Sequence, residues 1–100
     1  MIKANKKKII VLGGGMIGRV IAADLAAESL YAVTIADISA AEERGGEGID
    51  HRCIDLSDSN NVAGLVKNFD LVVGALPSQM GYATMKAVIE AGKDYCDISF

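Results

Sequence analysis

Apolar and polar positions form alternating blocks of two kinds along the chain. Short apolar runs are typical of parallel strands that are buried on both faces, and longer stretches carry apolar residues at intervals of three and four, as helices do. The predicted strands are 9–12, 31–36, 49–54, 70–75 and 94–98. The alternation therefore predicts one α/β domain over residues 1–100, with a doubly wound parallel sheet of about five strands in the order 3-2-1-4-5.

Three stretches between these strands have helical spacing. The first runs from Met16 to about Glu28, the second begins after Ser57 or Asp58 as its cap, and the third begins at a capping Ser78 and ends at Gly92. The expected apolar stripes are Ile17, Val20, Ile21 and Leu25; Val62, Leu65 and Val66, with Phe69 beyond; and Met85, Val88 and Ile89.

Two segments depart from this pattern. Residues 39–48 contain three glycines and few apolar side chains, so a short helix or a loop is expected there. The run 49–54 mixes polar with apolar residues, which is typical of a strand at the edge of a sheet.

A glycine motif lies where the first strand passes into the first helix. Residues 13–18, Gly-Gly-Gly-Met-Ile-Gly, fit G-x-G-x-x-G. Gly13 allows a tight turn, Gly15 removes a side chain that would collide with a pyrophosphate, and Gly18 lets the helix pack closely on the strand. The helix start, with Met16 and Ile17, supplies unpaired N–H groups and a positive dipole end. The context predicts a Rossmann-type dinucleotide site, although a glycine turn without a ligand stays open as the alternative.

An acid follows the second strand at the distance that this motif requires. Asp37 lies 19 positions after Gly18 and is suited to accept hydrogen bonds from the ribose hydroxyls, with Ile38 beside it. Its charge would repel a 2′-phosphate, which favours NAD over NADP. Two alternatives stay open: Arg44 in the 39–48 segment binds a 2′-phosphate, or Asp37 only caps a following turn.

Two further places follow from the predicted strand order. Asp55 and Leu56 end the third strand where the adenine ring would lie, although Asp55 serves equally well as a loop cap. Ala75, Leu76 and Pro77, with Ser78 after them, leave the fourth strand at the crevice where the strand order reverses, and are expected beside the nicotinamide ribose.

Charge and hydropathy exclude several classes of partner. The net charge of −3 and the isoelectric point of about 5.0 give no attraction to nucleic acid or to an anionic membrane surface. The Lys6-Lys7-Lys8 run is interpreted as a solvated entry to the first strand rather than a basic patch. No apolar run reaches the roughly 18 residues of a membrane span.

The reactive side chains are few. Cys53 and Cys96 lack the spacing of a disulfide framework or a zinc site, so a reducing, cytoplasmic location and no metal are expected. His51, the single histidine, is expected to be exposed and without a role. No residue is suited to act as a general acid or base, so no catalytic residue is assigned and the chain alone is expected to be inactive.

Taken together, these segments resemble the amino-terminal part of the saccharopine dehydrogenase family, which includes saccharopine reductases and lysine dehydrogenases. The resemblance extends over nearly the whole chain. Its most particular element is the closing Gly-x-x-Tyr-x-Asp-x-Ser-Phe pattern. The segments that carry it are 10–18 (Ile-Val-Leu-Gly-Gly-Gly-Met-Ile-Gly), 33–37 (Val-Thr-Ile-Ala-Asp), 55–56 (Asp-Leu), 74–77 (Gly-Ala-Leu-Pro) and 91–100 (Ala-Gly-Lys-Asp-Tyr-Cys-Asp-Ile-Ser-Phe).

The resemblance implies a nicotinamide-linked oxidoreductase acting on an amino acid or an imine derived from one, with NAD or NADP. Enzymes of this family continue into a second domain that contacts the substrate, so the chain is expected to be a fragment that lacks it. A regulatory NAD(H)-sensing module of a channel or transporter is the alternative. An unpaired outer strand would also favour self-association.

Overall fold

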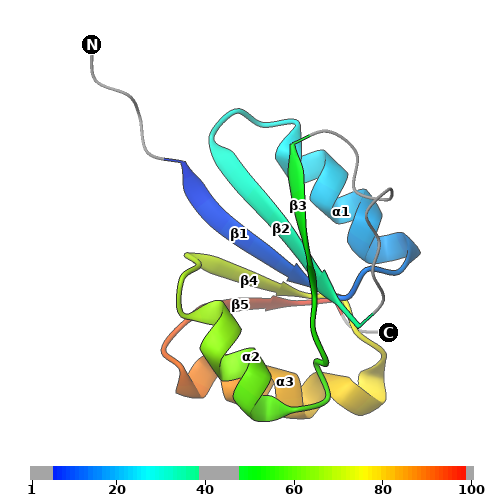
Figure 1. The fold of residues 1–100 in the computed structure, drawn as a ribbon, viewed down its shortest axis with the longest axis vertical. Helices are drawn as coiled ribbons and strands as arrows, with labels where there is room; N and C mark the ends of the chain where they lie inside the picture. The colour runs from blue at the N-terminus through cyan, green and yellow to red at the C-terminus, as the bar shows by residue number, and fades with distance from the viewer. Residues whose placement is uncertain (1–5, 39–47, 99–100) are drawn as a thin grey trace.

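The chain folds around one sheet of five parallel strands. The computed structural model describes residues 6–38 and 48–98, and Figure 1 shows their arrangement. The strand order β3-β2-β1-β4-β5 confirms the predicted topology. The strands are β1 (Lys7–Leu12), β2 (Tyr31–Asp37), β3 (Ile49–Cys53), β4 (Leu71–Gly74) and β5 (Asp94–Asp97), and the helices are α1 (Met16–Ala26), α2 (Ser59–Val66) and α3 (Ser78–Glu90).

The helices lie on opposite faces of the sheet, with α1 on one face and α2 and α3 together on the other (Figure 1). Alternate residues of the central strand β1 pack against the helices on the two faces of the sheet, because successive side chains of a strand point to opposite faces. Ile9 and Val11 pack in the cluster beneath α1, and Ile10 and Leu12 pack in the cluster beneath α2 and α3. All four are fully or almost fully buried, as expected for a doubly covered strand.

The buried face of α1 differs from the predicted stripe. Gly18 and Ala22 are the buried residues of this helix, whereas Ile17 and Val20 are 42% and 63% exposed. The helix approaches the sheet closely through its small residues, and this turns the two larger side chains outward. Ile21 and Leu25 pack against the same cluster, as predicted.

The residues at the cap positions define where α2 and α3 begin and where α3 ends. Asp58 caps α2 by accepting from the Asn60 N–H at 2.9 Å, so the aspartate of the two predicted candidates is the cap. The prediction that Ser78 caps α3 is wrong, because Pro77 occupies the cap position and Ser78 is the first helical residue. Gly92 has a φ of +79°, and the hydrogen bond from its N–H to the Ile89 carbonyl closes α3 as predicted.

Strand limits differ from the predicted limits by one or two residues. Strand β1 begins at Lys7, because the main chain of the lysine run pairs with the start of β2, so only the side chains are solvated. The limits of β3, β4 and β5 are shorter by one or two residues. Strand β3 is an edge strand as expected, but His51 within it is half-buried, which corrects the prediction of an exposed imidazole.

A glycine and a tyrosine on neighbouring strands fit together near the end of β4. A Cβ at Gly74 would collide with the Tyr95 hydroxyl and would lie 2.6 Å from the ring carbon that bears it. The absence of a side chain at position 74 therefore makes room for the phenol ring, which packs against the cluster beneath α2 and α3.

We expect Gly74→Ala to lower the free energy of unfolding by about 1–3 kcal/mol, because the Tyr95 ring must move. Gly64 is the matched control: it lies in α2 with nothing within 4 Å of its added Cβ, so Gly64→Ala should raise stability by up to about 1 kcal/mol. Chemical denaturation checks both. If the loss at position 74 persists when Tyr95→Leu is added, the contact with the ring is not its cause.

Burial, followed by the charges of Asp97 and Cys96, raises the pKa of Tyr95 from 10.0 to about 12. The folded chain thus holds this proton more tightly than the unfolded chain does. The corresponding stability is present below pH 10 and is lost as the pH rises toward 12. We expect Tyr95→Phe to lose less stability than the parent chain over this interval in urea titrations. Equal losses in both proteins would contradict the assignment.

Candidate functional site

The turn between β1 and α1 is built from backbone that leaves no room for side chains. Gly13 has a φ of +113°, in the left-handed region, and its added Cβ would collide with the main-chain oxygen of Ala75. An added Cβ at Gly18 would collide with the carbonyl oxygen of Gly13. The Gly13 N–H donates to the Ala36 oxygen at 2.8 Å. Two of the three glycines of the motif are therefore required by packing, as the sequence predicted.

The remaining glycine of the motif faces open space. An added Cβ at Gly15 would have nothing within 4 Å. Gly15 is the N-cap of α1, no side chain bonds to the helix start, and the first turn carries no acid. Met16 and Ile17 follow it and are exposed. No side chain or acid therefore competes for the N–H groups at this helix start, and such groups favour a phosphate.

Asp37 lies next to this turn. It is the last residue of β2, and an added Cβ at Gly14 would lie 2.8 Å from its Oδ2 atom. Its Oδ1 atom accepts a hydrogen bond from the Ile38 N–H at 2.9 Å. The carboxylate thus contributes to a local cap, which was one of the alternatives, and it also borders the glycine turn as a ribose ligand must.

A groove of about 500 Å³ opens beside Asp37 at the carboxyl ends of the strands. Six of the predicted site residues line it, contributed by the segments that follow β2, β3 and β4, and its surface is mainly apolar. The predicted residues are Asp37, Ile38, Asp55, Leu56, Leu76 and Pro77, and Ser57 and Met80 complete the lining. A mainly apolar hollow of this size, bordered by the carboxylates of Asp37 and Asp55, suits an adenosine group.

Asp55 is held by local hydrogen bonds within this lining. Its Oδ1 atom accepts from the Ser57 hydroxyl at 2.6 Å and from the Ser57 N–H at 3.0 Å. These bonds, with the hydroxyl as the larger contribution, hold the pKa of the Asp55 carboxyl below its usual range. The loop-cap interpretation is therefore correct for one carboxylate oxygen, and the residue still borders the groove.

The structure separates some predicted residues from the groove and adds others. Ala75 is buried beneath the glycine turn, so it supports the turn and does not line the groove. Met80 packs against the cluster beneath α2 and α3 and also lines the groove from the first turn of α3, which lies beside residues 56 and 57. No local sequence signal indicated that these two segments would meet. Arg44, the alternative ligand for a 2′-phosphate, lies outside the described residues.

Among residues 6–38 and 48–98 no group of three or more potential ligands is placed to hold a metal ion. Cys53 and Cys96 are free thiols. None of the helices in these two ranges combines the length and the apolarity that crossing a bilayer requires.

The chain is similar to a known family and to several solved structures. Residues 9–100 match the family described as the saccharopine dehydrogenase NADP binding domain. An apo saccharopine dehydrogenase (L-Glu forming) from Saccharomyces cerevisiae superposes with a TM-score of 0.77 at 21% identity, over 94% of this chain and 22% of that one.

Two further solved structures share the fold. A variant of uronate dehydrogenase from Agrobacterium tumefaciens complexed with NAD has a TM-score of 0.64 and 24% identity, over 87% of this chain and 36% of its own. A short-chain dehydrogenase/reductase from Veillonella parvula in complex with NADP has values of 0.71 and 16%, over 91% and 46%. The chain thus spans less than half of each of these proteins, and at these identities the likeness concerns the fold.

The glycine turn gives a test that separates packing from ligand space. We expect Gly18→Ala to lower the free energy of unfolding by about 2–3 kcal/mol, because backbone atoms would have to move. Gly15→Ala should cost no more than about 1 kcal/mol, since its backbone is extended and its surroundings are open. Thermal and urea denaturation of both variants check this. Similar losses at the two positions would show that the space at Gly15 is not free.

Proposed function

The chain belongs to the family of saccharopine dehydrogenase NADP-binding domains, and we propose that it binds NAD at the carboxyl edge of its sheet as the cofactor domain of an oxidoreductase. The observation that carries the proposal is the open, uncapped helix start at Gly15, next to Asp37 and its apolar groove. A dinucleotide requires these three features side by side: a site for the pyrophosphate, an acceptor for the ribose and a surface for the adenine.

Each part of the cofactor has residues suited to hold it. The N–H groups after Gly15 would hold the pyrophosphate, since no side chain competes for them. Asp37 would accept hydrogen bonds from the ribose hydroxyls. The groove between Ile38, Leu56 and Leu76 would bury the adenine ring. Pro77, at the cap position of α3, would border the path toward the nicotinamide.

The preference for NAD rests on Asp37. Its carboxylate lies against Gly14, and it is fixed there by the hydrogen bond from Ile38. A 2′-phosphate on the adenosine ribose would bring negative charge toward this carboxylate, whereas free hydroxyls would donate to it. The family description names NADP. In this chain we attribute a preference for NAD over NADP to the carboxylate of Asp37.

The bound nicotinamide would supply hydride transfer, and the chain's residues would bind and orient it. The substrate we propose is an amino acid or an imine derived from one, held by parts of the enzyme outside these 100 residues. This chain matches 22% of the yeast saccharopine dehydrogenase. The remaining length of that protein supports the proposal that other parts of the enzyme hold the substrate. A cytoplasmic location and self-association through the outer strands belong to the same proposal. The family match gives no support to the nucleotide-sensing alternative.

Calorimetric titration of the chain with NADH and with NADPH tests the cofactor proposal. We expect NADH to bind at least about tenfold more tightly than NADPH. The Asp37 carboxylate would accept hydrogen bonds from the ribose hydroxyls of NADH, and it would repel the 2′-phosphate of NADPH. Asp37→Ser should weaken NADH binding and bring the two affinities together. Asp94→Ser is the matched control, since this exposed acid begins β5 at the opposite edge of the sheet.

The outcomes of this titration separate the parts of the proposal. Tighter binding of NADPH would overturn the preference for NAD and leave the dinucleotide site intact. Failure of both cofactors to bind would overturn the site itself. Gly15→Ala tests the site without regard to the preference for NAD. It should abolish binding of both cofactors, because its methyl group would occupy the phosphate position.

A further inference from the structure

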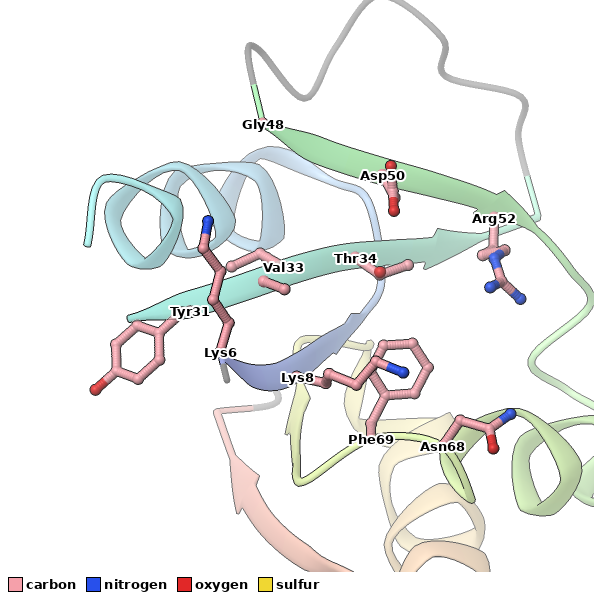
Figure 2. Close-up of a pocket in the computed structure, with 11 residues that line it drawn as sticks. Lys6, Lys8, Tyr31, Val33, Thr34, Gly48, Asp50, Arg52, Asn68 and Phe69 are labelled. Carbon is pink, nitrogen blue, oxygen red and sulfur yellow. The ribbon is translucent and has the colours of Figure 1, made fainter. Parts of the chain in front are cut away.

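A second hollow lies on the sheet face that carries α2 and α3, away from the glycine turn. Its volume is about 370 Å³, and its lining comes from β1, β2, β3 and the turn after α2 (Figure 2). Unlike the groove at the carboxyl ends, it is lined mainly by polar atoms. The two hollows have no lining residue in common.

The charge of this hollow opposes the charge of the whole chain. Lys6, Lys8 and Arg52 line it together with one carboxylate, Asp50, in a chain of net charge −3. Even without Lys6, whose ammonium group points away, the lining has an excess of one positive charge. Among the residues that the structure describes, none of these cations has an ion-pair or hydrogen-bond partner for its side chain. Uncompensated cations around one concave space favour an anionic occupant.

The polar groups come from different elements and are directed to the same space. Figure 2 shows the nitrogen-bearing ends of Lys8 and Arg52 and the amide end of Asn68 facing it, whereas the ammonium group of Lys6 points away. Thr34 lies between them on β2. It is a buried threonine, and within the described ranges its hydroxyl makes no hydrogen bond. A polar group in this position is suited to bind a ligand.

The elements that carry these groups are firmly held. The Lys8 N–H donates to the Asp70 carboxylate at 2.8 Å, and the Asp70 N–H donates to the Lys8 oxygen at 2.7 Å. The Asp70 carboxylate thus binds the main chain of Lys8 and does not neutralise the Lys8 ammonium group. Phe69 is buried beside the hollow, and its N–H bonds to the Val66 oxygen, which fixes the turn that presents Asn68.

We propose that this hollow binds a small organic polyanion, a phosphate ester or a polycarboxylate, through Lys8, Arg52, Asn68 and Thr34. The volume is within the range of small-molecule sites. Two cations from separate strands match a ligand with at least two anionic groups, and the amide and hydroxyl supply neutral hydrogen bonds. The site is independent of the proposed dinucleotide site.

Amide chemical shifts of the isotope-labelled chain test the proposal in phosphate-free buffer, with citrate and tripolyphosphate as separate probes. We expect at least one probe to shift the resonances of Ala32, Thr34 and Asn68 in a saturable manner at millimolar concentration or below. Comparison of the two probes distinguishes carboxylate from phosphate as the preferred group. Shifts confined to Gly14 and Gly15 would report the glycine turn instead, so the two sites remain distinguishable.

Charge variants sharpen the test. Lys8→Gln and Arg52→Gln should each weaken binding about tenfold, whereas Asp50→Asn should tighten it, because the carboxylate repels the ligand. Lys86→Gln is the matched control, as an exposed lysine of α3 outside the hollow. The proposal is overturned if neither probe shifts these resonances, or if Lys86→Gln weakens binding as much as Lys8→Gln does.

Discussion

The contact between the carbonyl oxygen of Gly13 and the backbone of Gly18 sets the geometry on which the site depends. No Cβ fits at position 18, so the first turn of α1 lies directly against the end of β1. That approach places the start of the helix above the carboxyl edge of the sheet, beside Asp37. A longer distance between helix and strand would move the N–H groups away from the carboxylate and the groove. Packing and ligand binding therefore share one constraint.

Much of the fold and part of the site could be predicted because their signals are local in the sequence. Apolar runs identified the strands, and the rules of doubly wound sheets gave their order. The roles of Gly13 and Gly18 followed from backbone geometry alone, and the position of Asp37 followed from the motif. These features depend on how a short segment folds, so a single sequence contains them.

The unpredicted features depend on contacts between distant segments. Apolar spacing alone could not show that the close approach of α1 through Gly18 and Ala22 would leave Ile17 and Val20 exposed. Met80 borders the groove because the first turn of α3 lies beside residues 56 and 57, in the segment between β3 and α2. The basic hollow forms because side chains of β1, β2 and β3 and of the turn after α2 border one space. At the two proposed sites an acidic chain would accommodate anions locally, with main-chain dipoles at one and side-chain charges at the other.

The position of β1 in the sheet has a consequence for biosynthesis. Its residues pair with β2 on one side and, across a long stretch of sequence, with residues 71–74 of β4 on the other. During synthesis on the ribosome, the central strand of the sheet therefore keeps one edge unpaired until β4 has emerged. Pairing between such distant segments slows folding and leaves nascent chains open to aggregation. A chaperone that shields this edge would serve the growing polypeptide best before the second half of the sheet is complete.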